Sequence, residues 1–407
     1  MKSMRNAQSA FRLFGFTGFA AASALALALA RHGNLSLWIV AGLAACGAVT
    51  FLVVAMATKV VTGVESLTYY HHQIAVLPMS ALMLWALRTP LLPYLDIDVL
   101  GIGVFLAFGR IGCLKAGCCY GLPCPRGARY GRSYMGSVLP RHLAEIPLFP
   151  VQAIESAGVL AIVILGTLQV AVGHPPGSAL STYLVGYAFL RFFLEFLRGG
   201  TDRRFAWGFS EAQWTSLAVL GGTIGLEAQG TLPFEMWHVA AFAAIVLAAI
   251  ALQLNPRLRS MHRLFHPSRI EEFAQALEFA SHTAAAKHPL PASSAIHVSA
   301  TKMGIRVSGG YLSDGATSVW HYTLSQAGGS MSERTARLLA TLASRLIGSA
   351  DPFKILPGRS GVYHLLPAGT FRTPSGPGEE RDPARKRFGP RSSRVPGFNC
   401  NEEAEPK

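Results

Sequence analysis

The chain has 407 residues, of which 51% are apolar and only 14% are charged. An average soluble domain carries about 25% charged residues, so this composition excludes an ordinary soluble protein as well as a disordered or collagen-like chain. The formal net charge of +14 would suit nucleic acid or anionic lipid. The apolar stretches are long enough to span a bilayer, so we expect membrane lipid as a partner and expect no nucleic acid.

A series of apolar stretches fills the first 255 residues. A spanning helix needs about 20 mostly apolar residues. The run after Met1 continues into further apolar segments, so we expect no cleaved signal peptide. The third and seventh stretches are the shortest, and the third is expected to be tilted or partly re-entrant. The sequence therefore predicts an all-α polytopic membrane bundle of 7–8 transmembrane helices over residues 1–255. The stretches are residues 13–30, 33–58, 73–87, 99–121, 156–173, 179–197, 213–226 and 237–254.

The composition changes after residue 255. Residues 256–294 are expected to form a basic juxtamembrane helix and a linker, because four arginines fall between residues 257 and 269 and residues 270–287 have amphipathic helical spacing. Residues 288–294 are rich in Pro, Ala and Ser, which is typical of a linker. Residues 368–407 are dominated by Pro, Gly, Ser and Arg without apolar periodicity, which predicts a disordered tail.

A small soluble α+β domain is predicted between these segments, over residues 295–367. Alternating apolar and polar residues indicate half-buried strands, and an Asp-Gly pair is a turn signal between them. At about 75 residues such a unit is near the lower limit for independent stability. Its expected elements are a strand at 296–307, a second strand after the Asp314-Gly315 turn, a helix at 332–347 with Leu338, Leu339, Leu342 and Leu346 on one face, and a hairpin at 353–366.

The sixth apolar stretch carries four polar side chains at spacings of four, four and three, which place them on one helical face. A charged group inside a membrane is costly, so an arginine within an apolar helix needs an anion. One interpretation is an internal ion pair that faces the bundle. The other is a phosphate-binding stripe, because guanidinium suits bidentate phosphate contact. The four residues are Tyr187, Arg191, Glu195 and Arg198.

A second intramembrane arginine, Arg110, lies in a glycine-rich segment that ends at Gly121. Glycines leave the backbone open to close approach. Arg110 and Arg191 could therefore clamp one lipid phosphate between two helices; the alternative is that Arg110 extends from a helix end to the lipid headgroups. His71 is a candidate general base, with solvated histidines in an interfacial aromatic belt as the alternative. Gln152 and Glu155 add polar groups at the start of the fifth stretch.

Four cysteines fall within twelve residues: Cys113, Cys118, Cys119 and Cys124. No Cys-x-x-Cys pair occurs among them, and adjacent cysteines seldom both ligate one structural zinc, so no metal site is expected. Three interpretations remain open. The cysteines could form a disulfide in an oxidising compartment, supply a nucleophilic thiol activated by Arg110 or Lys115, or pack as small apolar residues.

Taken together, these landmarks resemble the bacterial phosphatidylglycerol–prolipoprotein diacylglyceryl transferase family. The match covers roughly residues 10–228 and depends on the order of four blocks, of which the last two agree in spacing as well. The blocks are Tyr70-His71-His72, where the family has His-Gly-Gly; Gly109-Arg110-Ile111-Gly112 with Gly117 and Gly121; Pro150-x-Gln152-x-x-Glu155; and Gly186-Tyr187-x-x-x-Arg191-x-x-x-Glu195-x-x-Arg198 with Gly208-Phe209-Ser210 and Gln213-Trp214.

The resemblance implies a multi-pass enzyme of the bacterial cytoplasmic (inner) membrane. Such an enzyme moves the diacylglyceryl group of phosphatidylglycerol onto the lipobox cysteine thiol of a prolipoprotein, without a cofactor, and releases glycerol phosphate. By the same match, Arg110 and Arg191 would hold the lipid phosphate, His71 would be the base, and Tyr187 and Glu195 would orient them. The substrate-binding set implied is Arg110, Gly112, Gly121, Gln152, Glu155, Arg191 and Arg198.

The chain departs from the family signature at several polar positions. Cys113 replaces the signature Asn, Cys118 replaces the signature Glu, and Phe149 stands where the family has a histidine before Pro-x-Gln. These changes match a divergent subgroup with a Gly-Cys-Cys-Tyr-Gly signature, whose substrate could differ. Two other functions therefore stay open: a thiol–disulfide or metal-handling membrane protein on the same fold, and a non-catalytic lipid-binding scaffold.

The side of the membrane on which the arginine-rich loops lie is predicted differently by two arguments. Loops 122–149 and 198–208 both carry several arginines, which favours the cytoplasmic side by the positive-inside rule. The resemblance implies seven spans with the amino terminus and the active-site loop outside. We favour the family arrangement for the bundle, because its acceptor is a translocated precursor.

Overall fold

The computed structural model describes residues 2–62, 69–131, 134, 139–201, 203–285, 298–313, 318–349 and 352–366. The chain divides into two units, Met1–Ile270 and Glu271–Lys407. The predicted linker at 288–294, the Asp314-Gly315 turn and the predicted tail at 368–407 lie outside the described residues, as do the side chains of residues 71–73.

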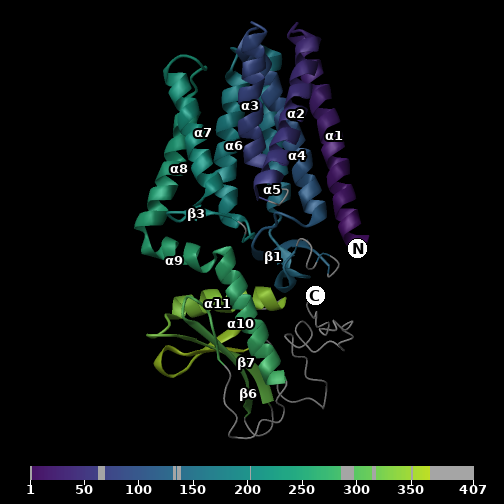
Figure 1. The fold of residues 1–407 in the computed structure, drawn as a ribbon. Helices are drawn as coiled ribbons and strands as arrows, with labels where there is room; N and C mark the ends of the chain where they lie inside the picture. The colour runs from purple at the N-terminus through teal and green to yellow at the C-terminus, as the bar shows by residue number, and fades with distance from the viewer. Residues whose placement is uncertain are drawn as a thin grey trace, which may run out of the picture. The chain divides into compact units, whose positions relative to one another are not determined.

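Eight long helices run side by side in the described part of the first unit (Figure 1). Six of these eight described helices are long and apolar enough to cross a membrane; the exceptions are α3 and α7. This confirms the predicted polytopic bundle, and the two exceptions correspond to the two shortest predicted stretches. The helices are α1 (Lys2–His32), α2 (Leu37–Thr62), α3 (Tyr69–Ala86), α4 (Leu91–Ala116), α5 (Val151–Val172), α6 (Ser178–Leu194), α7 (Glu211–Ala228) and α8 (Met236–Leu254), followed by the short α9 (Pro256–Leu264).

Local signals set the ends of these helices. α4 follows Pro90 and ends at Gly117, whose φ of 76° is the left-handed conformation typical of a helix C-cap. α7 begins with a capping box, in which Ser210 and Gln213 satisfy each other's backbone N–H groups. α6 has no cap of its own. Instead Asp96 of α4 accepts hydrogen bonds of 2.7 Å from the N–H groups of Gly177 and Leu180. The apolar stretch predicted to begin at residue 99 therefore begins earlier, and its first turns carry an acid with a structural partner.

α4 and α6 are the most buried of the spanning helices, since 61% of the apolar span of each is buried inside the protein. α4 packs antiparallel to α1 through small residues: a Cβ on Gly18 would lie 2.7 Å from Phe108, and Gly101 faces Ala22. On its other side Gly103 faces Tyr183 of α6. The two helices that carry Arg110 and Arg191 therefore lie in the middle of the bundle.

The segment after α4 is tied to the end of α6. β1 (Pro123–Arg129) pairs with β2 (Pro147–Leu148), and the Leu122 N–H donates to the Leu197 carbonyl at 2.9 Å. Gly121 forms an isolated bridge with Arg198. A Cβ on Gly121 would lie 2.3 Å from the Phe149 carbonyl oxygen, so only glycine fits there. A second short pair, β3 (Phe205–Ala206) and β4 (Phe209–Ser210), precedes α7.

The second unit contains an antiparallel sheet and a helix, which confirms the predicted α+β region. In its described part the strand order is β5-β6-β7-β9-β8. α11 (Glu333–Ile347) is capped by Ser332 and buries Leu339, Leu342 and Leu346, whereas Leu338 is half-buried. The other elements are α10 (Pro267–Ala285), which crosses the division between the units, β5 (Ser299–Ala300), β6 (Ile305–Ser313), β7 (Ser318–Gln326), β8 (Lys354–Pro357) and β9 (Tyr363–Leu366).

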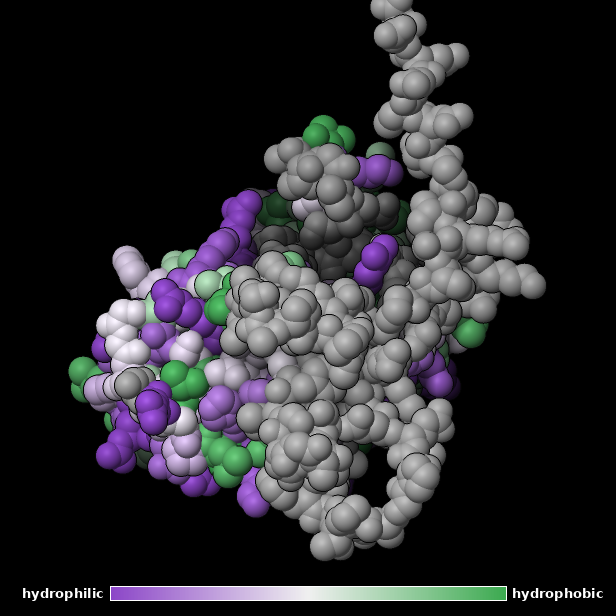
Figure 2. Space-filling model, turned by 90° about the horizontal axis from the view of Figure 1, so that it is seen from below, coloured by the Kyte–Doolittle hydropathy of each residue, from purple (hydrophilic) through white to green (hydrophobic). Residues whose placement is uncertain are grey.

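One predicted strand, residues 296–307, is wrong as a single element. The chain reverses between β5 and β6, and the two-residue strand β5 pairs antiparallel with the start of β6. Gly304 has a φ of 75°, and the Thr301 hydroxyl accepts the Ile305 N–H, so a tight turn interrupts the alternating pattern. The described surface in Figure 2 is mostly hydrophilic, with single apolar residues between polar ones.

Candidate active site

Three helices converge on the carboxylate of Glu155, in the second turn of α5. Glu155 is only 1% exposed. The Tyr187 hydroxyl of α6 donates to its Oε1 at 3.0 Å, and Arg110 Nε of α4 lies 3.0 Å from its Oε2. Arg191 Nε of α6 lies 4.0 Å from Oε1. The two intramembrane arginines that the sequence singled out therefore meet at one buried group.

A second carboxylate extends this chain of charges. Arg191 Nη1 lies 2.7 Å from Glu195 Oε2, so the internal ion pair considered from the sequence is present. Glu195 also accepts a hydrogen bond of 2.6 Å from Arg203 Nη1. The remaining guanidinium nitrogens of Arg203 donate to the carbonyls of Gly200 and Arg198. The charges alternate along the line Arg110, Glu155, Arg191, Glu195 and Arg203.

Arg198 does not lie on the helical face that the sequence predicted for it. α6 ends at Leu194, a 3₁₀ turn covers Glu195–Leu197, and Arg198 is extended, with φ −79° and ψ 140°. The backbone of Arg198 is held by its bridge to Gly121, which stops the helix from continuing. Arg198 still interacts electrostatically with Glu155 and Glu195. The site thus contains four arginines and two glutamates, with a formal net charge of +2. They are Arg110, Arg191, Arg198, Arg203, Glu155 and Glu195.

The other predicted binding residues hold the backbone in place. Gln152, which is 1% exposed, donates from Nε2 to the Cys118 carbonyl at 2.6 Å. Gly112 faces α1, where an added Cβ would lie 3.3 Å from Phe14, and Gly121 lies against Phe149. His71 falls in α3, but its side chain lies outside the described residues.

Three of the four cysteines that the sequence offers as a possible thiol site form a cluster. The sulfur atoms of Cys113, Cys118 and Cys119 all lie within 4.8 Å of one another. Cys113 lies in the last turn of α4, and the chain then turns back through Gly117 and through Cys119, whose φ is 53°. Cys124 is engaged elsewhere, since its Sγ donates to the Arg126 carbonyl at 2.6 Å. None of the five cysteines of the described part, these four and Cys46, forms a disulfide.

The pKa values of the Cys118 and Cys119 thiols are shifted in opposite directions. Hydrogen bonds from Cys113 and Cys118, helped by the positive charges of Arg198 and Arg110, hold the pKa of Cys119 well below its usual range. Hydrogen bonds with Cys113 and Cys119, together with burial, raise the pKa of Cys118. Burial also raises the pKa of Tyr130 to about 12, so its hydroxyl keeps its proton and donates to the Leu114 carbonyl at 3.1 Å.

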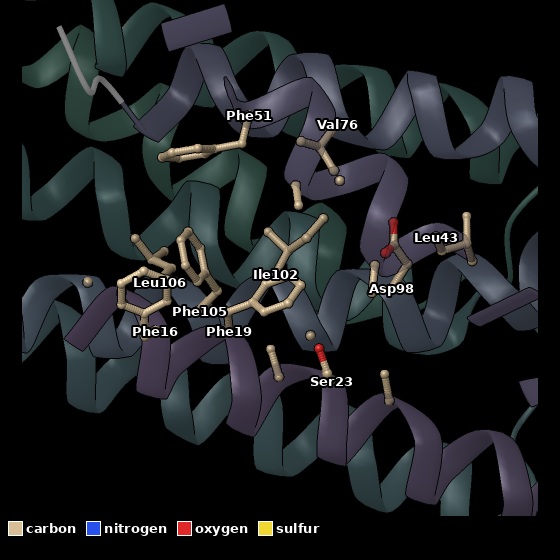
Figure 3. Close-up of a pocket in the computed structure, with 18 of the residues that line it drawn as sticks. Phe16, Phe19, Ser23, Leu43, Phe51, Val76, Asp98, Ile102, Phe105 and Leu106 are labelled. Carbon is tan, nitrogen blue, oxygen red and sulfur yellow. The ribbon is translucent and has the colours of Figure 1, made fainter. Parts of the chain in front are cut away.

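An apolar cavity of about 620 Å³ lies between α1, α2, α3 and α4. Figure 3 shows Phe16 and Phe19 of α1 near Phe105 and Leu106 of α4, with Asp98 farther along the cavity, near Leu43. Along α4 the lining runs from Ile97 to Cys113. Because α1 is antiparallel to α4, Arg12 lies at the same end of the cavity as Arg110 and Cys113, and both arginines contribute to the lining.

Sequence reasoning missed two charged residues of this region. Arg203 was noted only as one of several loop arginines, because a loop has no periodicity that assigns its side chains to a face. Asp98, whose side chain lines the cavity, was left out because the apolar stretch was taken to begin after it. The rule that an ionisable group in a membrane helix marks a functional site would have found Asp98.

Comparisons with known proteins point to one family. Residues 26–228 match the family model of prolipoprotein diacylglyceryl transferase. Phosphatidylglycerol–prolipoprotein diacylglyceryl transferase 2 of Clostridium perfringens (strain 13 / Type A) is 36% identical over 136 residues, which is 32% of this chain and 48% of the relative. The protein of that name, without the number, from Clostridium tetani is 36% identical over 112 residues, 26% and 42% of the two chains. One from Dehalococcoides mccartyi (strain 195) is 31% identical over 130 residues, 31% and 46%.

The chain spans about half the length of the curated relatives that it matches. No solved structure matches it.

Proposed function

Because residues 26–228 belong to the prolipoprotein diacylglyceryl transferase family, we propose that this multi-pass membrane protein moves a diacylglyceryl group from phosphatidylglycerol to a prolipoprotein. The acceptor is the lipobox cysteine thiol, the product is a thioether, and glycerol phosphate leaves. The proposed setting is the bacterial cytoplasmic (inner) membrane. The relatives at 30–36% identity carry this activity in their names.

The observation that carries the proposal is the meeting of Arg110 and Arg191 at Glu155, beside an apolar cavity. A phospholipid has an anionic phosphate next to two long acyl chains. The cavity suits the chains, and the guanidinium groups suit the phosphate, which guanidinium binds in a bidentate manner. Arg110 lines the cavity itself, so the phosphate would lie at the end of the chamber that receives the chains.

The reaction that follows is a displacement at a glycerol carbon. The acceptor sulfur forms a bond to the terminal carbon of the diacylglycerol, and the bond from that carbon to the phosphate oxygen breaks. The electron pair of the broken bond leaves with glycerol phosphate, where negative charge increases. Arg110 and Arg191 are already held in place by Glu155 and Glu195, so they stabilise this charge without reorganising.

The acceptor thiol must lose its proton during the reaction. His71 remains the proposed base, as the family resemblance implies. Tyr187 and Glu195 have positioning roles in this proposal, because each contacts a charged partner: Tyr187 donates to Glu155, and Glu195 pairs with Arg191. Most of the catalytic effect then comes from alignment of the sulfur, the carbon and the leaving oxygen.

The test uses the full chain in detergent with phosphatidylglycerol and a lipobox peptide. Mass spectrometry should detect the thioether-linked diacylglyceryl peptide. Arg110→Gln and Arg191→Gln should each abolish the product, whereas Arg259→Gln, at an exposed position on α9, should not. Thermal melting of each variant separates loss of chemistry from loss of fold. Retained transfer in both active-site variants would contradict the proposal.

A second candidate function is favoured by the cysteine cluster. Three free thiols within 4.8 Å of one another suit thiol–disulfide exchange or metal handling. In that case the chain would keep the family fold without transferring lipid. Complementation of a strain depleted of its own transferase distinguishes the two functions, because only a transferase restores lipoprotein maturation.

A further inference from the structure

Cys113, Cys118 and Cys119 have the geometry of a metal site. Three sulfurs that each lie about 2.3 Å from a zinc ion stand about 4 Å from one another. In this protein the three sulfurs lie within 4.8 Å of one another. A closing movement of less than about 1 Å, within the reach of side-chain rotation, would complete the coordination.

The backbone that carries these sulfurs is fixed in place. The Cys118 N–H donates to the Cys113 carbonyl at 3.2 Å, which closes the turn after α4. Gln152 holds the Cys118 carbonyl at 2.6 Å. Tyr130 holds the neighbouring Leu114 carbonyl. Because Gln152 and Tyr130 belong to other parts of the chain, the fold itself holds the three thiols near one another.

The surrounding charge suits a negatively charged metal–thiolate group. Three thiolates and one divalent cation sum to −1. The arginines and glutamates of the site sum to +2, and Arg198 and Arg110 both interact electrostatically with Cys119. Thiolate ligands select soft or borderline cations such as Zn²⁺ rather than Mg²⁺ or Ca²⁺.

The site offers three protein ligands. Cys124 would be the fourth by sequence, but its sulfur is hydrogen-bonded to the Arg126 carbonyl in the described structure. Structural zinc sites are closed by four protein ligands, whereas three ligands and an open position are typical of catalytic zinc. Cys113 also lines the apolar cavity beside Arg110, so an ion there would stand next to the proposed lipid site.

We propose that Cys113, Cys118 and Cys119 bind one Zn²⁺ as three thiolates and that the open position takes the acceptor thiol. The second part depends on the proposed transferase function. A thiol that coordinates zinc is deprotonated. The proton passes to the base or to solvent, and the zinc-bound sulfur then attacks the glycerol carbon. One S–C bond forms and one C–O bond breaks, and the electron pair leaves on the phosphate oxygen. The thioether product is a weaker ligand and dissociates from the ion.

The first experiment measures metal content without any lipid. The full chain is purified in detergent under reducing conditions, supplied with Zn²⁺, freed of excess metal and analysed by mass spectrometry of the elements. We expect one zinc per chain in the wild type. Cys113→Ser, Cys118→Ser and Cys119→Ser should each lose most of it. Cys46→Ser, on α2 outside the cluster, is the matched control, and Cys124→Ser should also retain the ion.

The second experiment replaces Zn²⁺ with Co²⁺ and records absorption spectra. Thiolate coordination should give a charge-transfer band that the Cys118→Ser variant lacks. Addition of a lipobox peptide should change the ligand-field bands, and a Cys→Ser peptide should not. These readouts require no lipid and no turnover. A metal-free wild type, equal zinc in Cys118→Ser and wild type, or a disulfide within the cluster under reducing conditions would each overturn the site.

Failure of this site and failure of the proposed function give different results. Transfer that continues after zinc is removed with a chelator would overturn the thiol-binding role and leave the transferase assignment intact. Zinc and peptide binding without transfer would support the site and contradict the transferase assignment. Loss of transfer on chelation, with recovery when Zn²⁺ is restored, is the result expected if both hold.

Discussion

Glu155 of α5 is the residue at which polar side chains of α4 and α6 meet. It lies between Arg110 and Arg191, and it also accepts the Tyr187 hydroxyl. A carboxylate that is 1% exposed is stable there only because cations and a hydrogen-bond donor surround it. Removing the carboxylate would leave Arg110 without its ion-pair partner in a buried position, which costs more than the pair itself contributes.

Glu155→Gln should therefore destabilise the bundle strongly. Breaking a buried ion pair from one side costs about 3–5 kcal/mol. Tyr187→Phe removes a single hydrogen bond to a charged group and should cost about 1.5–3 kcal/mol. The two variants can be compared by denaturant unfolding in detergent. If Glu155→Gln unfolds no more readily than Tyr187→Phe, the carboxylate is not the centre of the network.

His321 of β7 makes the second unit sensitive to acid. Burial, with a smaller effect of the nearby His364, lowers the pKa of His321 to about 4, against 6.5 for the free side chain. The folded state thus favours the neutral imidazole. Its contribution to stability is complete above pH 6.5 and falls as the pH drops from 6.5 towards 4. At pH 5 the loss is at most about 2 kcal/mol, and less with solvent screening.

This pH dependence can be followed by hydrogen exchange of the β7 amides in the full chain, corrected for the intrinsic effect of pH on exchange. Protection should fall between pH 7 and pH 5. His321→Phe should flatten the profile, because phenylalanine has no proton to gain and keeps a ring beside His364. An unchanged profile in that variant would assign the acid sensitivity to another group.

At the scale of elements, backbone contacts connect the end of α4 to the end of α6. The Gly121–Arg198 bridge and the Leu122 N–H bond to Leu197 join them. The cysteine cluster begins with Cys113 in the last turn of α4, Arg110 lies on α4, and Arg191 lies on α6. The position of the thiols relative to the guanidinium groups therefore depends on a backbone contact that tolerates no side chain at Gly121.

Gly121→Ala should disturb that junction. Its Cβ would lie 2.3 Å from the Phe149 carbonyl, so the backbone must move and the junction loses stability. Overpacking of this kind costs about 1–3 kcal/mol. Gly109→Ala is the matched control for folding, because nothing lies within 4 Å of its added Cβ and alanine favours a helix. Thermal melting of both variants tests the difference, and equal melting temperatures would contradict it.

Local periodicity predicted the eight apolar stretches and the shared face of Tyr187, Arg191 and Glu195, because those features depend on residues within one helix. The contact between Arg110 and Glu155 depends on how α4 packs against α5, which one helix does not determine. Arg203 was not assigned for the same reason: its partner Glu195 lies across a turn whose path is set by tertiary contacts.

Positive φ angles account for the other differences between sequence and structure. The left-handed conformation of Cys119, a residue that seldom adopts it, helps to bring adjacent cysteines to one cluster. Gly304 turns a predicted strand into two. Cysteine gives no signal for a left-handed turn, and glycine permits that conformation without requiring it, so the residue type alone placed neither turn.

At the scale of the whole molecule, the candidate site lies entirely in one of the two units. Arg110, Glu155, Arg191, Glu195 and the cysteine cluster all precede residue 270, where the first unit ends. The second unit has its own core, in which Tyr322 is fully buried and its hydroxyl lies 2.6 Å from Ser281 Oγ. The two units therefore have separate structural requirements.

A chain truncated after Ile270 should keep the transfer activity of the full protein, because no residue proposed for the chemistry is lost. The measurement is formation of the thioether product by the purified truncated chain, with thermal melting as the control for folding. A truncated chain that melts like the full protein but forms no product would assign part of the reaction to the second unit.

The pairing of Arg110 with Glu155 also constrains the order of biogenesis. The ribosome completes α4 before it makes α5, so the guanidinium enters the translocon before its counter-ion exists. An arginine at the centre of an inserting helix costs about 2.5–3.5 kcal/mol, and less near an end, where Arg110 lies. Insertion of α5 removes this penalty, which favours release of the two helices into the lipid as a hairpin rather than one at a time.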